Sequence, residues 1–574
     1  MHPGTATRTR PGAPAATAAT PTAPADPARR AALRRAGWWG DASLDDYWAL
    51  AVRAHPDAEA VVDARGARLT YAEADDRAAR IAAWLRAAGV GPGDVVSVQL
   101  PSWAEMVCVN AACLRIGAVV NPVLTAYREA ELRYLLRRCR SRALLVPTRF
   151  RGADHEPVAA RLAAELDDLV AVAAVPHNGR AATLVPDLAD LVAAHDPLPA
   201  ADRDPGRGGD VAAVLFTSGS EAEPKGVLLS HDNVLSGERA FAAVLGVGAG
   251  DRVFMPAPLG HATGYLHGVT LPYLTGATAL LLDVPTGPSA LAMIRAERAT
   301  CGMAAASVVG CLLDSCPPGE RLAPTLRFLG CGGSPVPRSL ARRAQDLGVP
   351  LLSVYGSTES APHALTTLAD DLERVLTTDG RPVPGVEVRV VDPVTRQPVP
   401  VGEVGEAASR GPQVFCGYLG EPELTAAVLD ADGWYYSGDL ARLDADGYLR
   451  VVGRCKDVII RGGENISAAE VEQVLRARPE VRDAAVVAMP DRRLGECVCA
   501  YLVLAPGAQA PDLGALREQF LARGLAKYKI PARVEVLDAL PLSPAGKVRK
   551  DVLRDRAAAL PAVEPRYPAP TEGR

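Results

Sequence analysis

Apolar and polar positions alternate with a helical period at the start of the regular part of the chain. Over 74–85 the apolar residues fall on one face of a helix. Thr70 and Glu73 stand just before this segment with the spacing of a capping box, and Gly89 follows as a helix stop. The elements predicted next are a strand at 95–100, a helix over 103–116 and a strand at 118–120. Because strands that alternate with helices favour a parallel sheet, we expect an α/β fold.

A second pattern begins in the last third of the chain. Apolar and charged residues alternate over 386–390, between turn sequences, which predicts a β-rich region from about 380 to 448. The elements predicted after it are a helix over 468–477, strands at 484–488 and 498–504, and a helix over 513–523. We expect these elements to form a small, compact α+β unit.

The two ends of the chain lack such patterns. Residues 1–35 are rich in Ala, Thr, Pro and Arg and contain few large apolar side chains, which predicts a disordered extension. The excess of arginine over acids in this segment is also compatible with a transit peptide. Residues 561–574 are rich in proline and are predicted to be a loose tail.

Composition narrows the class of protein. The net charge is −5 and the pI is near 6.1, which argues against nucleic acid or an anionic membrane as the main partner. No uncharged apolar run reaches the roughly 18 residues of a membrane span. The eleven cysteines form no Cys-x-x-Cys pair, and we interpret them as buried small side chains in a reducing cytoplasm.

The stretch 214–231 contains the densest candidate chemistry. An apolar strand runs into hydroxyl groups and a glycine, and Pro224, Lys225 and Gly226 follow. Backbone amides, hydroxyls and one cation can together hold a polyphosphate, although a polar surface turn is the alternative for this loop alone. A Walker A loop is excluded. In that motif the lysine is followed by Ser or Thr and then a helix, whereas here Lys225 is followed by Gly226 and an apolar stretch. The phosphate-binding candidates are Thr217, Ser218, Gly219, Ser220 and Lys225.

This loop resembles the phosphate-binding signature of the ATP-dependent adenylating superfamily, which includes acyl-CoA synthetases, luciferases and peptide-synthetase adenylation domains. The superfamily pattern is Thr-Ser-Gly-Thr-Thr-Gly-x-Pro-Lys-Gly, and here Ser220-Glu221-Ala222 replaces Thr-Thr-Gly. Four further motifs occur in the superfamily's order, and the resemblance covers about residues 40–555. These motifs are Tyr355-Gly356-Ser357-Thr358-Glu359, Ser437-Gly438-Asp439, the stretch 452–466, and Gly546-Lys547.

The resemblance implies a role for each matching residue. Tyr355 and Gly356 would contact adenine, and Thr358 would bind the α-phosphate. Glu359 would hold Mg²⁺, which takes few carboxylates and completes its shell with phosphate oxygens and water. The other implied roles are ribose binding for Asp439, ribose or phosphate contact for Arg454, catalysis for Lys547 together with Thr358 and Glu359, the hinge for Lys456, and the thiol-transfer loop for Gly462 and Gly463.

Small residues and one histidine are candidates for an acyl pocket. His261 stands between glycines and is compatible with either a packed loop residue or a pocket residue; the resemblance implies the pocket. Residues 257–268 contain no acid, and because a buried ammonium without a counter-ion is costly, we expect a substrate without an α-amine. The acyl-pocket candidates are His261, Gly264, Ala306, Gly310, Cys331 and Gly332, and the turn Gly332-Gly333-Ser334 would lie under the adenine and the acyl group.

The implied function is that of an ATP-dependent acid–CoA ligase. A carboxylate would attack the α-phosphorus of ATP to give an acyl-adenylate, and the thiol of CoA would then displace AMP after the small domain rotates. The implied domains are a large N-terminal domain of stacked α/β sheets with a β-rich subdomain over 36–453, a hinge at 454–456 and a small mobile α+β domain over 457–560.

Three points stay open at this stage. One alternative is an enzyme that stops at acyl-AMP or passes the acyl group to a carrier protein or a partner ligase. Another is an inactive nucleotide-binding paralogue, against which the complete set of motifs argues. The identity of the acid and the oligomeric state, with a homodimer as one option, are not determined by the sequence.

Overall fold

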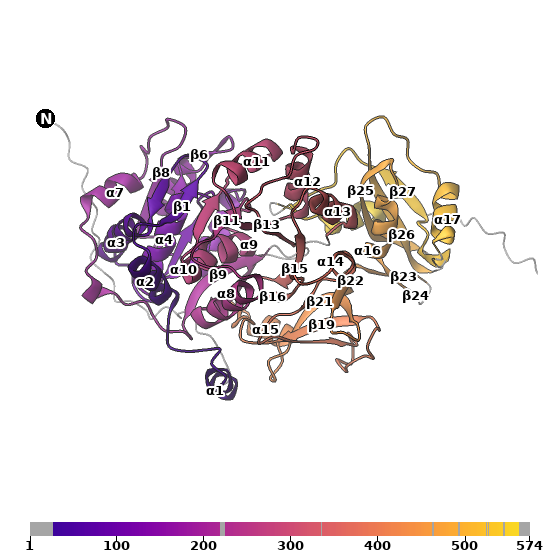
Figure 1. Cartoon of the computed structure of the whole chain (residues 1–574), viewed down its shortest axis with the longest axis horizontal. Helices are drawn as coiled ribbons and strands as arrows, with labels where there is room; N and C mark the ends of the chain where they lie inside the picture. Colours follow the sequence, from indigo (N-terminus) through magenta and orange to yellow (C-terminus); the bar gives the residue numbers. More distant parts are fainter. Residues whose placement is uncertain are drawn as a thin grey trace, which may run out of the picture.

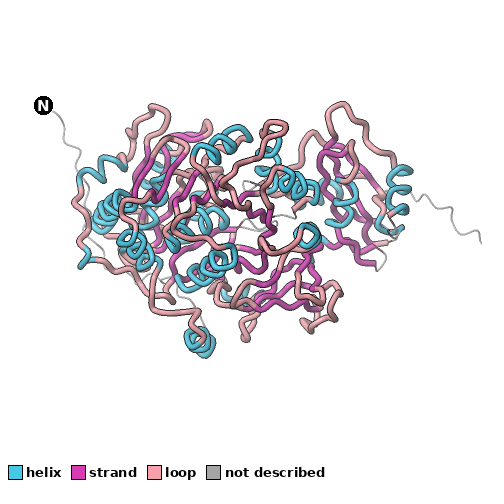
Figure 2. The backbone as a smooth tube through the Cα atoms, viewed as in Figure 1, coloured by secondary structure: helices cyan, strands magenta, loops and turns pink. Residues whose placement is uncertain are grey.

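The computed structural model describes residues 27–217, 224–333, 336–461, 464–491, 494–523, 525, 527–543 and 546–561. Two large sheets, a four-stranded sheet and a smaller C-terminal sheet contain almost all of its strands. Figure 1 shows the large sheets at one end of an elongated molecule, the C-terminal unit at the other end, and the four-stranded sheet beneath the junction. Figure 2 shows that helices flank the large sheets and the C-terminal sheet.

The seven-stranded sheet contains the first strands predicted from the sequence. Its order is β20-β10-β9-β4-β3-β5-β8. The strands β9, β4, β3, β5 and β8 are parallel to one another, and β10 pairs antiparallel with both β9 and β20. Its strands are β3 (Val95–Val98), β4 (Val119–Pro122), β5 (Ala143–Pro147), β8 (Ala171–Val175), β9 (Val211–Thr217), β10 (Lys225–Ser230) and β20 (Gly417–Tyr418). The helices of this region are α3 (Tyr71–Ala87), α4 (Ala104–Arg115), α5 (Glu129–Cys139), α6 (Glu156–Glu165) and α7 (Leu188–Ala194). The α/β prediction and the first four predicted elements are confirmed.

The nine-stranded sheet packs against the same core. Its order is β17-β16-β15-β14-β13-β11-β12-β1-β2. Its strands are β1 (Glu59–Asp63), β2 (Arg68–Thr70), β11 (Arg252–Met255), β12 (Thr278–Leu281), β13 (Cys301–Ala304), β14 (Leu329–Gly332), β15 (Leu351–Ser357), β16 (Ser360–Leu365) and β17 (Arg381–Pro382). Val96 and Leu145 of the seven-stranded sheet belong to the same buried apolar cluster as Val61 and Leu281 of this sheet. The two sheets therefore fold as one body.

Further helices and short elements accompany these sheets. The helices are α2 (Leu44–Ala54), α8 (His231–Leu245), α9 (Ala262–Tyr265), α10 (Leu271–Thr275), α11 (Gly287–Ala296), α12 (Ala306–Asp314), α13 (Arg338–Asp346) and α14 (Leu372–Thr377). The short elements are the hairpin β6 (Arg149–Phe150) and β7 (Ala153–Asp154), the 3₁₀ turn η1 (Ala200–Asp202) and the π-helical turn η2 (Leu266–Thr270).

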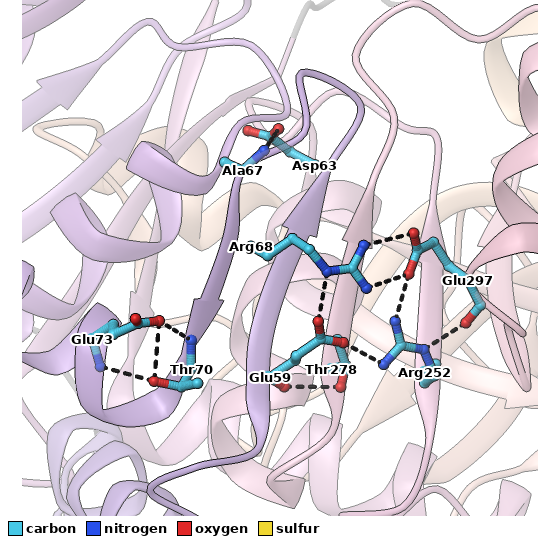
Figure 3. Close-up of polar contacts among 9 residues, drawn as sticks. All are labelled: Glu59, Asp63, Ala67, Arg68, Thr70, Glu73, Arg252, Thr278 and Glu297. Carbon is cyan, nitrogen blue, oxygen red and sulfur yellow. Dashed lines mark hydrogen bonds and ion pairs between the residues drawn. The ribbon is translucent and has the colours of Figure 1, made fainter.

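The edge of the nine-stranded sheet shows how the local sequence starts a helix. The amide of Glu73 donates to Thr70 Oγ1 at 3.2 Å, and the amide of Thr70 donates to Glu73 Oε2 at 2.9 Å (Figure 3). The predicted capping box is thus formed at the start of α3. Beside it, Arg68 binds both carboxylate oxygens of Glu297 at 2.8 Å, and Arg252 binds Glu297 Oε2 at the same distance. This charged network ties β2 to β11.

The predicted β-rich region forms the four-stranded sheet. Its order is β18-β19-β21-β22, and every pairing is antiparallel. Its strands are β18 (Glu387–Val391), β19 (Gly405–Arg410), β21 (Tyr435–Leu443) and β22 (Leu449–Arg454), and α15 (Pro422–Val428) lies between β20 and β21. The last strand of this sheet leads directly into the C-terminal unit.

The C-terminal unit has a sheet and a core of its own. The sheet order is β24-β23-β26-β25, with β27 beside β26. Its strands are β23 (Val458–Arg461), β24 (Glu464–Ser467), β25 (Val481–Asp491), β26 (Gly495–Leu504) and β27 (Arg533–Val536), and its helices and 3₁₀ turns are η3 (Cys455–Asp457), α16 (Ala468–Arg476), α17 (Leu513–Ala522), η4 (Lys527–Lys529) and α18 (Lys550–Ala558). Ile459, Val486 and Phe520 lie in its buried cluster. The predicted α+β unit is confirmed.

The prediction of a disordered extension over 1–35 is wrong for residues 27–35. These residues form α1 (Pro27–Arg35), which lies below the large sheets in Figure 1. An Arg29 Nη atom donates to the carbonyl of Gly411 at 3.0 Å. The composition argument missed this helix because α1 buries no residue of its own, and polar contacts attach it. Residues 1–26 and 562–574 lie outside the described residues.

All eleven cysteines are free thiols. Eight are buried, as predicted, whereas Cys311 on α12 is exposed. Within the described ranges, no helix is both long and apolar enough to cross a bilayer.

Candidate active site

The predicted phosphate loop is the connection of the β9–β10 hairpin. Thr217 at the end of β9 and Lys225 at the start of β10 are paired across this hairpin. The pairing brings a hydroxyl and an ammonium group to the same end of the two strands. Ser218, Gly219 and Ser220 lie outside the described residues, so their predicted role stays a prediction.

Glu359 lies in the tight turn between β15 and β16. Its side chain is nearly buried, and its Oε1 accepts a hydrogen bond from the Tyr418 hydroxyl at 2.8 Å. The Lys225 ammonium lies over the Tyr418 ring, 5.3 Å from its centre. Tyr418 therefore links the predicted metal carboxylate to the predicted phosphate lysine. The sequence analysis did not select Tyr418, because a tyrosine that follows the apolar run 414–416 is typical of a core position.

Asp439 and Arg454 are fixed by strand pairing. They lie opposite each other in β21 and β22, and Arg454 Nε donates to Asp439 Oδ1 at 2.7 Å. The Tyr355 hydroxyl donates to Asp439 Oδ2 at 2.9 Å. The Asp439 charge raises the pKa of the Arg454 guanidinium, and burial followed by the same charge raises the pKa of Tyr355. The predicted adenine and ribose residues are thus brought together around one carboxylate.

His363, to which the sequence analysis gave no role, supports Tyr355. Its ring is buried and meets the Tyr355 ring edge-on, with centres 5.0 Å apart. His363 Nε2 lies 3.1 Å from the Ser409 hydroxyl. Burial lowers the pKa of His363 to about 4, so the ring is neutral at pH 7 and acts as a packing and hydrogen-bonding group. The only sequence signal for this role of His363 is its position just beyond the Tyr-Gly-x-Thr-Glu motif.

Lys547 reaches this group of residues from the C-terminal unit. Its main chain is fixed by Ser543, whose amide donates to the Lys547 carbonyl at 2.7 Å. Desolvation, and then the Arg454 charge, lower the pKa of the Lys547 ammonium, while Asp439 and Glu359 oppose this shift. The residue as a whole is exposed, although its ammonium is desolvated. Charged residues of both parts of the chain therefore act on Lys547.

His261 lies within electrostatic range of the same lysine. Burial, and then the Lys547 charge, lower the pKa of His261 to about 4, so the imidazole is neutral at pH 7. His261 Nδ1 accepts the Thr263 amide at 3.3 Å and caps α9. A side chain on Gly260 would come within 2.6 Å of the Val123 main chain. The glycine on this side of His261 thus allows a close approach of two main-chain segments.

The other predicted acyl-pocket residues lie in different surroundings, and their shared role stays a prediction. Gly264 packs against the Pro258 carbonyl, and Gly332 against the Val354 carbonyl, where a side chain would overlap each oxygen. The Cys331 thiol is 0% exposed in the core beneath α11–α13, so its side chain lines no accessible surface in this structure. A Cβ added at Gly310 on α12 would lie 3.9 Å from Leu340 Cδ1, which is ordinary van der Waals contact.

Two further small residues border these positions. Ala306 begins α12 and is half-buried, and Gly333 has a positive φ of 81° with open space where a side chain would be. A larger residue at Gly333 would be strained by its backbone rather than by its neighbours. Ser334 lies outside the described residues.

The predicted hinge is a single 3₁₀ turn. Lys456 is the middle residue of η3, which connects β22 to β23. The next residue, Asp457, accepts a hydrogen bond from Arg554 at 3.2 Å and lies 3.5 Å from the Lys550 ammonium. Both partners belong to α18, the helix that follows Lys547. The hinge and the catalytic lysine are thus attached to the same rigid element.

The thiol-transfer loop is only partly described. Gly462 and Gly463 lie outside the described residues. Beyond them, Ser467 Oγ accepts the Glu470 amide at 3.3 Å as the cap of α16 and donates to the Val452 carbonyl at 2.8 Å. A serine cap thus starts this helix without the proline that the superfamily often places after it.

The residues around Glu359 fit a magnesium ion. One carboxylate oxygen is held by Tyr418, and in the part of the chain that the structure describes the other oxygen accepts no hydrogen bond. The described residues contain no cluster of three or more metal-ligating side chains. Mg²⁺ commonly takes one or two carboxylates and completes its shell with phosphate oxygens and water, so a single carboxylate beside a phosphate site matches this chemistry.

These features are compatible with the predicted site for a nucleoside triphosphate, with Lys547 of the C-terminal unit within electrostatic range of it. Family models match the chain as "AMP-binding enzyme" over residues 48–419 and as "AMP-binding enzyme C-terminal domain" over residues 470–547. The chain belongs to the AMP-binding enzyme family.

Individual relatives refine this assignment. The medium-chain fatty-acid–CoA ligase of Escherichia coli K12 is 46% identical over 526 residues, which is 92% of each chain. The salicylyl-CoA synthase / salicylate adenylyltransferase of a Streptomyces species is 36% identical and covers 91% of this chain and 95% of its own. The crystal structure of ATP-bound MatB from Rhodopseudomonas palustris has a TM-score of 0.81 at 29% identity and covers 90% of this chain and 99% of its own.

Proposed function

We propose that this protein is an ATP-dependent acid–CoA ligase that activates a carboxylic acid as its acyl-adenylate and then forms the CoA thioester. The observation that carries the proposal is that the charges of Lys547, Asp439, Glu359 and His261 act on one another. The cation of the C-terminal unit thus lies within electrostatic range of carboxylates in the four-stranded sheet and at the β15–β16 turn, as adenylation requires.

The first half-reaction joins two anions. An oxygen of the acid attacks the α-phosphorus of ATP, and pyrophosphate leaves, so charge repulsion contributes much of the barrier. The Lys547 ammonium offsets this repulsion, and the neutral His261 adds no competing charge beside it. Asp439 accepts the ribose hydroxyls and Tyr355 packs on the base. Mg²⁺ held by Glu359 would supply further neutralisation of the phosphates when bound.

The second half-reaction needs a different arrangement. Once the acyl-adenylate exists, Lys547 occupies space that a thiol needs to reach the acyl carbon. Rotation at Lys456 would carry Lys547 away together with α18, because Asp457 binds that helix. The sulfur of CoA then attacks the acyl carbon, and AMP leaves with the bonding electrons.

For the substrate, we propose a medium-chain fatty acid. The E. coli medium-chain fatty-acid–CoA ligase is 46% identical, whereas the relatives named for salicylate and for a naphthoate are 36% identical. The segment 257–268 around His261 offers no acid to pair with an α-amine. The eleven free thiols support a cytoplasmic location, which we include in the proposal.

The test is acid-dependent release of pyrophosphate from ATP, measured with and without CoA. The acids are saturated fatty acids of increasing length, salicylate, benzoate and an amino acid. We expect the highest rate on a medium-chain fatty acid, with a CoA thioester as the product. Release that stops at acyl-AMP would overturn the ligase proposal and favour a carrier protein or a partner ligase as acceptor. A preference for salicylate would overturn the substrate proposal alone.

A further inference from the structure

Tyr418 contacts both Glu359 and Lys225 but has no step of its own in the proposed reaction. We propose that Tyr418 is a positioning residue that holds the Glu359 carboxylate and the Lys225 ammonium in register, and so sets the affinity of the site for the metal–nucleotide complex. The inference rests on the proposed function, because that function assigns Glu359 to the metal ion and Lys225 to the phosphates.

The contacts of Tyr418 place it between the two groups. Its hydroxyl donates to Glu359 Oε1 at 2.8 Å, and its ring face lies 5.3 Å from the Lys225 ammonium. Its ring is 6% exposed and meets Phe415 edge-on at 4.9 Å. A ring held in this way cannot follow the carboxylate if the carboxylate rotates, so the hydrogen bond fixes the carboxylate.

A tyrosine suits this position because it is neutral. A lysine or arginine bonded to Glu359 would cancel the charge that attracts a cation. The phenol instead donates one hydrogen bond and leaves the carboxylate negative. Within the described part of the chain the second oxygen of Glu359 accepts no hydrogen bond, so Tyr418 holds one oxygen and leaves the other for a ligand.

The segment that carries Tyr418 is bonded on both sides. On one side the Phe415 amide donates to the Glu359 carbonyl at 2.8 Å, so the main chains of the two residues are also joined. On the other side, Asn233 Nδ2 donates to the Pro412 and Val414 carbonyls at 2.9 Å, and the Trp39 indole donates to Pro412 at 3.0 Å. The segment 411–418 therefore couples the position of Glu359 to the positions of α8 and of Trp39.

The decisive measurement is metal binding without turnover. Tyr418→Phe keeps the ring and removes the hydroxyl. Free Mn²⁺ is measured by electron paramagnetic resonance during titration of the protein saturated with α,β-methylene-ATP, which the adenylation step cannot cleave. We expect the Kd for Mn²⁺ to rise about tenfold, the effect of losing one hydrogen bond to a charged group. Acyl transfer from supplied acyl-AMP to CoA should stay within about twofold of wild type, because the metal site is not used in that step.

Controls separate this role from general damage and from failure of the proposed function. Tyr448→Phe also removes a tyrosine hydroxyl that donates to a carboxylate, that of Asp370 on another part of the fold, and should leave the Mn²⁺ affinity unchanged. Glu359→Gln should weaken Mn²⁺ binding more than Tyr418→Phe does. Normal affinity in Tyr418→Phe together with a loss in Glu359→Gln would overturn the role of Tyr418 and leave the proposed function intact. Normal affinity in both variants would overturn the assignment of Glu359.

A second variant keeps the proposal testable if Tyr418→Phe fails to fold. Trp39→Phe removes the indole bond to Pro412 and touches neither Glu359 nor Lys225. We expect a rise in the Kd for Mn²⁺ of about twofold to threefold, since the segment 411–418 keeps its bonds to Asn233. An unchanged Kd in Trp39→Phe, when Tyr418→Phe cannot be obtained, would contradict the proposed transmission through this segment.

Discussion

The residues proposed to bind ribose and the lysine proposed for catalysis are held in opposite ways. Asp439 and Arg454 face each other across the ladder of β21 and β22 and are joined by a 2.7 Å hydrogen bond. Lys547 stands on a short segment before α18 and enters from a unit with its own core. The proposed nucleotide-binding residues are held together by strand pairing and side-chain hydrogen bonds, whereas the proposed catalytic lysine belongs to a unit with a separate core. Binding and catalysis should therefore respond to different mutations.

The largest expected effect comes from Lys547→Ala. We expect acyl-AMP formation to fall by at least about 100-fold, since removal of one transition-state charge contact has effects of this size. Transfer from supplied acyl-AMP to CoA should change little, because Lys547 leaves the site for that step. Rapid-quench assays of the two half-reactions measure this, and Lys527→Ala, on the exposed turn η4, is the matched control. Equal losses in both half-reactions would contradict domain alternation.

Lys456→Pro should have a smaller effect, and it should slow thiol transfer rather than adenylation. Proline fixes φ in the turn η3 and restricts the rotation that removes Lys547. We expect thiol transfer to fall about tenfold while adenylation stays within about twofold. Lys456→Ala separates loss of the side chain from loss of rotation. Transfer at the wild-type rate in the proline variant would place the hinge elsewhere.

A still smaller effect is expected on the pH dependence of adenylation, and it tests whether Lys547 is the group that titrates. Desolvation and Arg454 lower the pKa of Lys547, so its charge is lost at a lower pH than that of an ordinary lysine. The rate of adenylation should be highest at pH values below this lowered pKa and should decline as the pH rises through it. Lys547→Arg should move the alkaline limb to higher pH, because a guanidinium stays protonated there. An alkaline limb at the same pH in both proteins would assign it to another group.

The smallest expected effect is on stability. Ser467→Ala removes the cap of α16 and the bond to the Val452 carbonyl. We expect the free energy of unfolding of the C-terminal unit to fall by about 1 kcal/mol, the usual effect of losing an N-cap. Urea unfolding followed by circular dichroism measures the change, and Ser467→Thr should restore most of it. A variant as stable as wild type would mean that the missing proline is compensated elsewhere.

Much of the fold could be predicted because local patterns agree with the final packing. The capping box of Thr70 and Glu73, the buried strand at 95–100 and the alternation over 386–390 each gave the observed element. The apolar residues of α3 lie on its buried face, and the apolar run of β3 is buried along its whole length. The helix α1 was missed because it has no buried apolar face, and a pattern of apolar residues contains no information about arginine contacts over long sequence distances.

The site was predictable only where the chemistry lies in contiguous motifs. Tyr355, Asp439 and Arg454 converge as the resemblance implies, since each belongs to a short motif on a strand or a strand end. Tyr418 and His363 act through side-chain contacts with residues that lie 59 and 46 positions away. The burial of Cys331 could not be predicted for a related reason: successive residues of a strand point to opposite faces, and the sequence did not show which face of β14 meets the helices.

The exposed thiol of Cys311 offers a direct way to observe the proposed motion between the two units. Eight of the other ten cysteines are buried, and burial raises the pKa of the Cys331 and Cys301 thiols to about 12, so alkylating reagents should react first at α12. A fluorophore attached there sits on the large body, and an acceptor introduced on α17 would sit on the small one. The distance between the two dyes would then report each catalytic cycle. We expect it to change once when acyl-AMP forms and to return to its starting value when the thioester leaves.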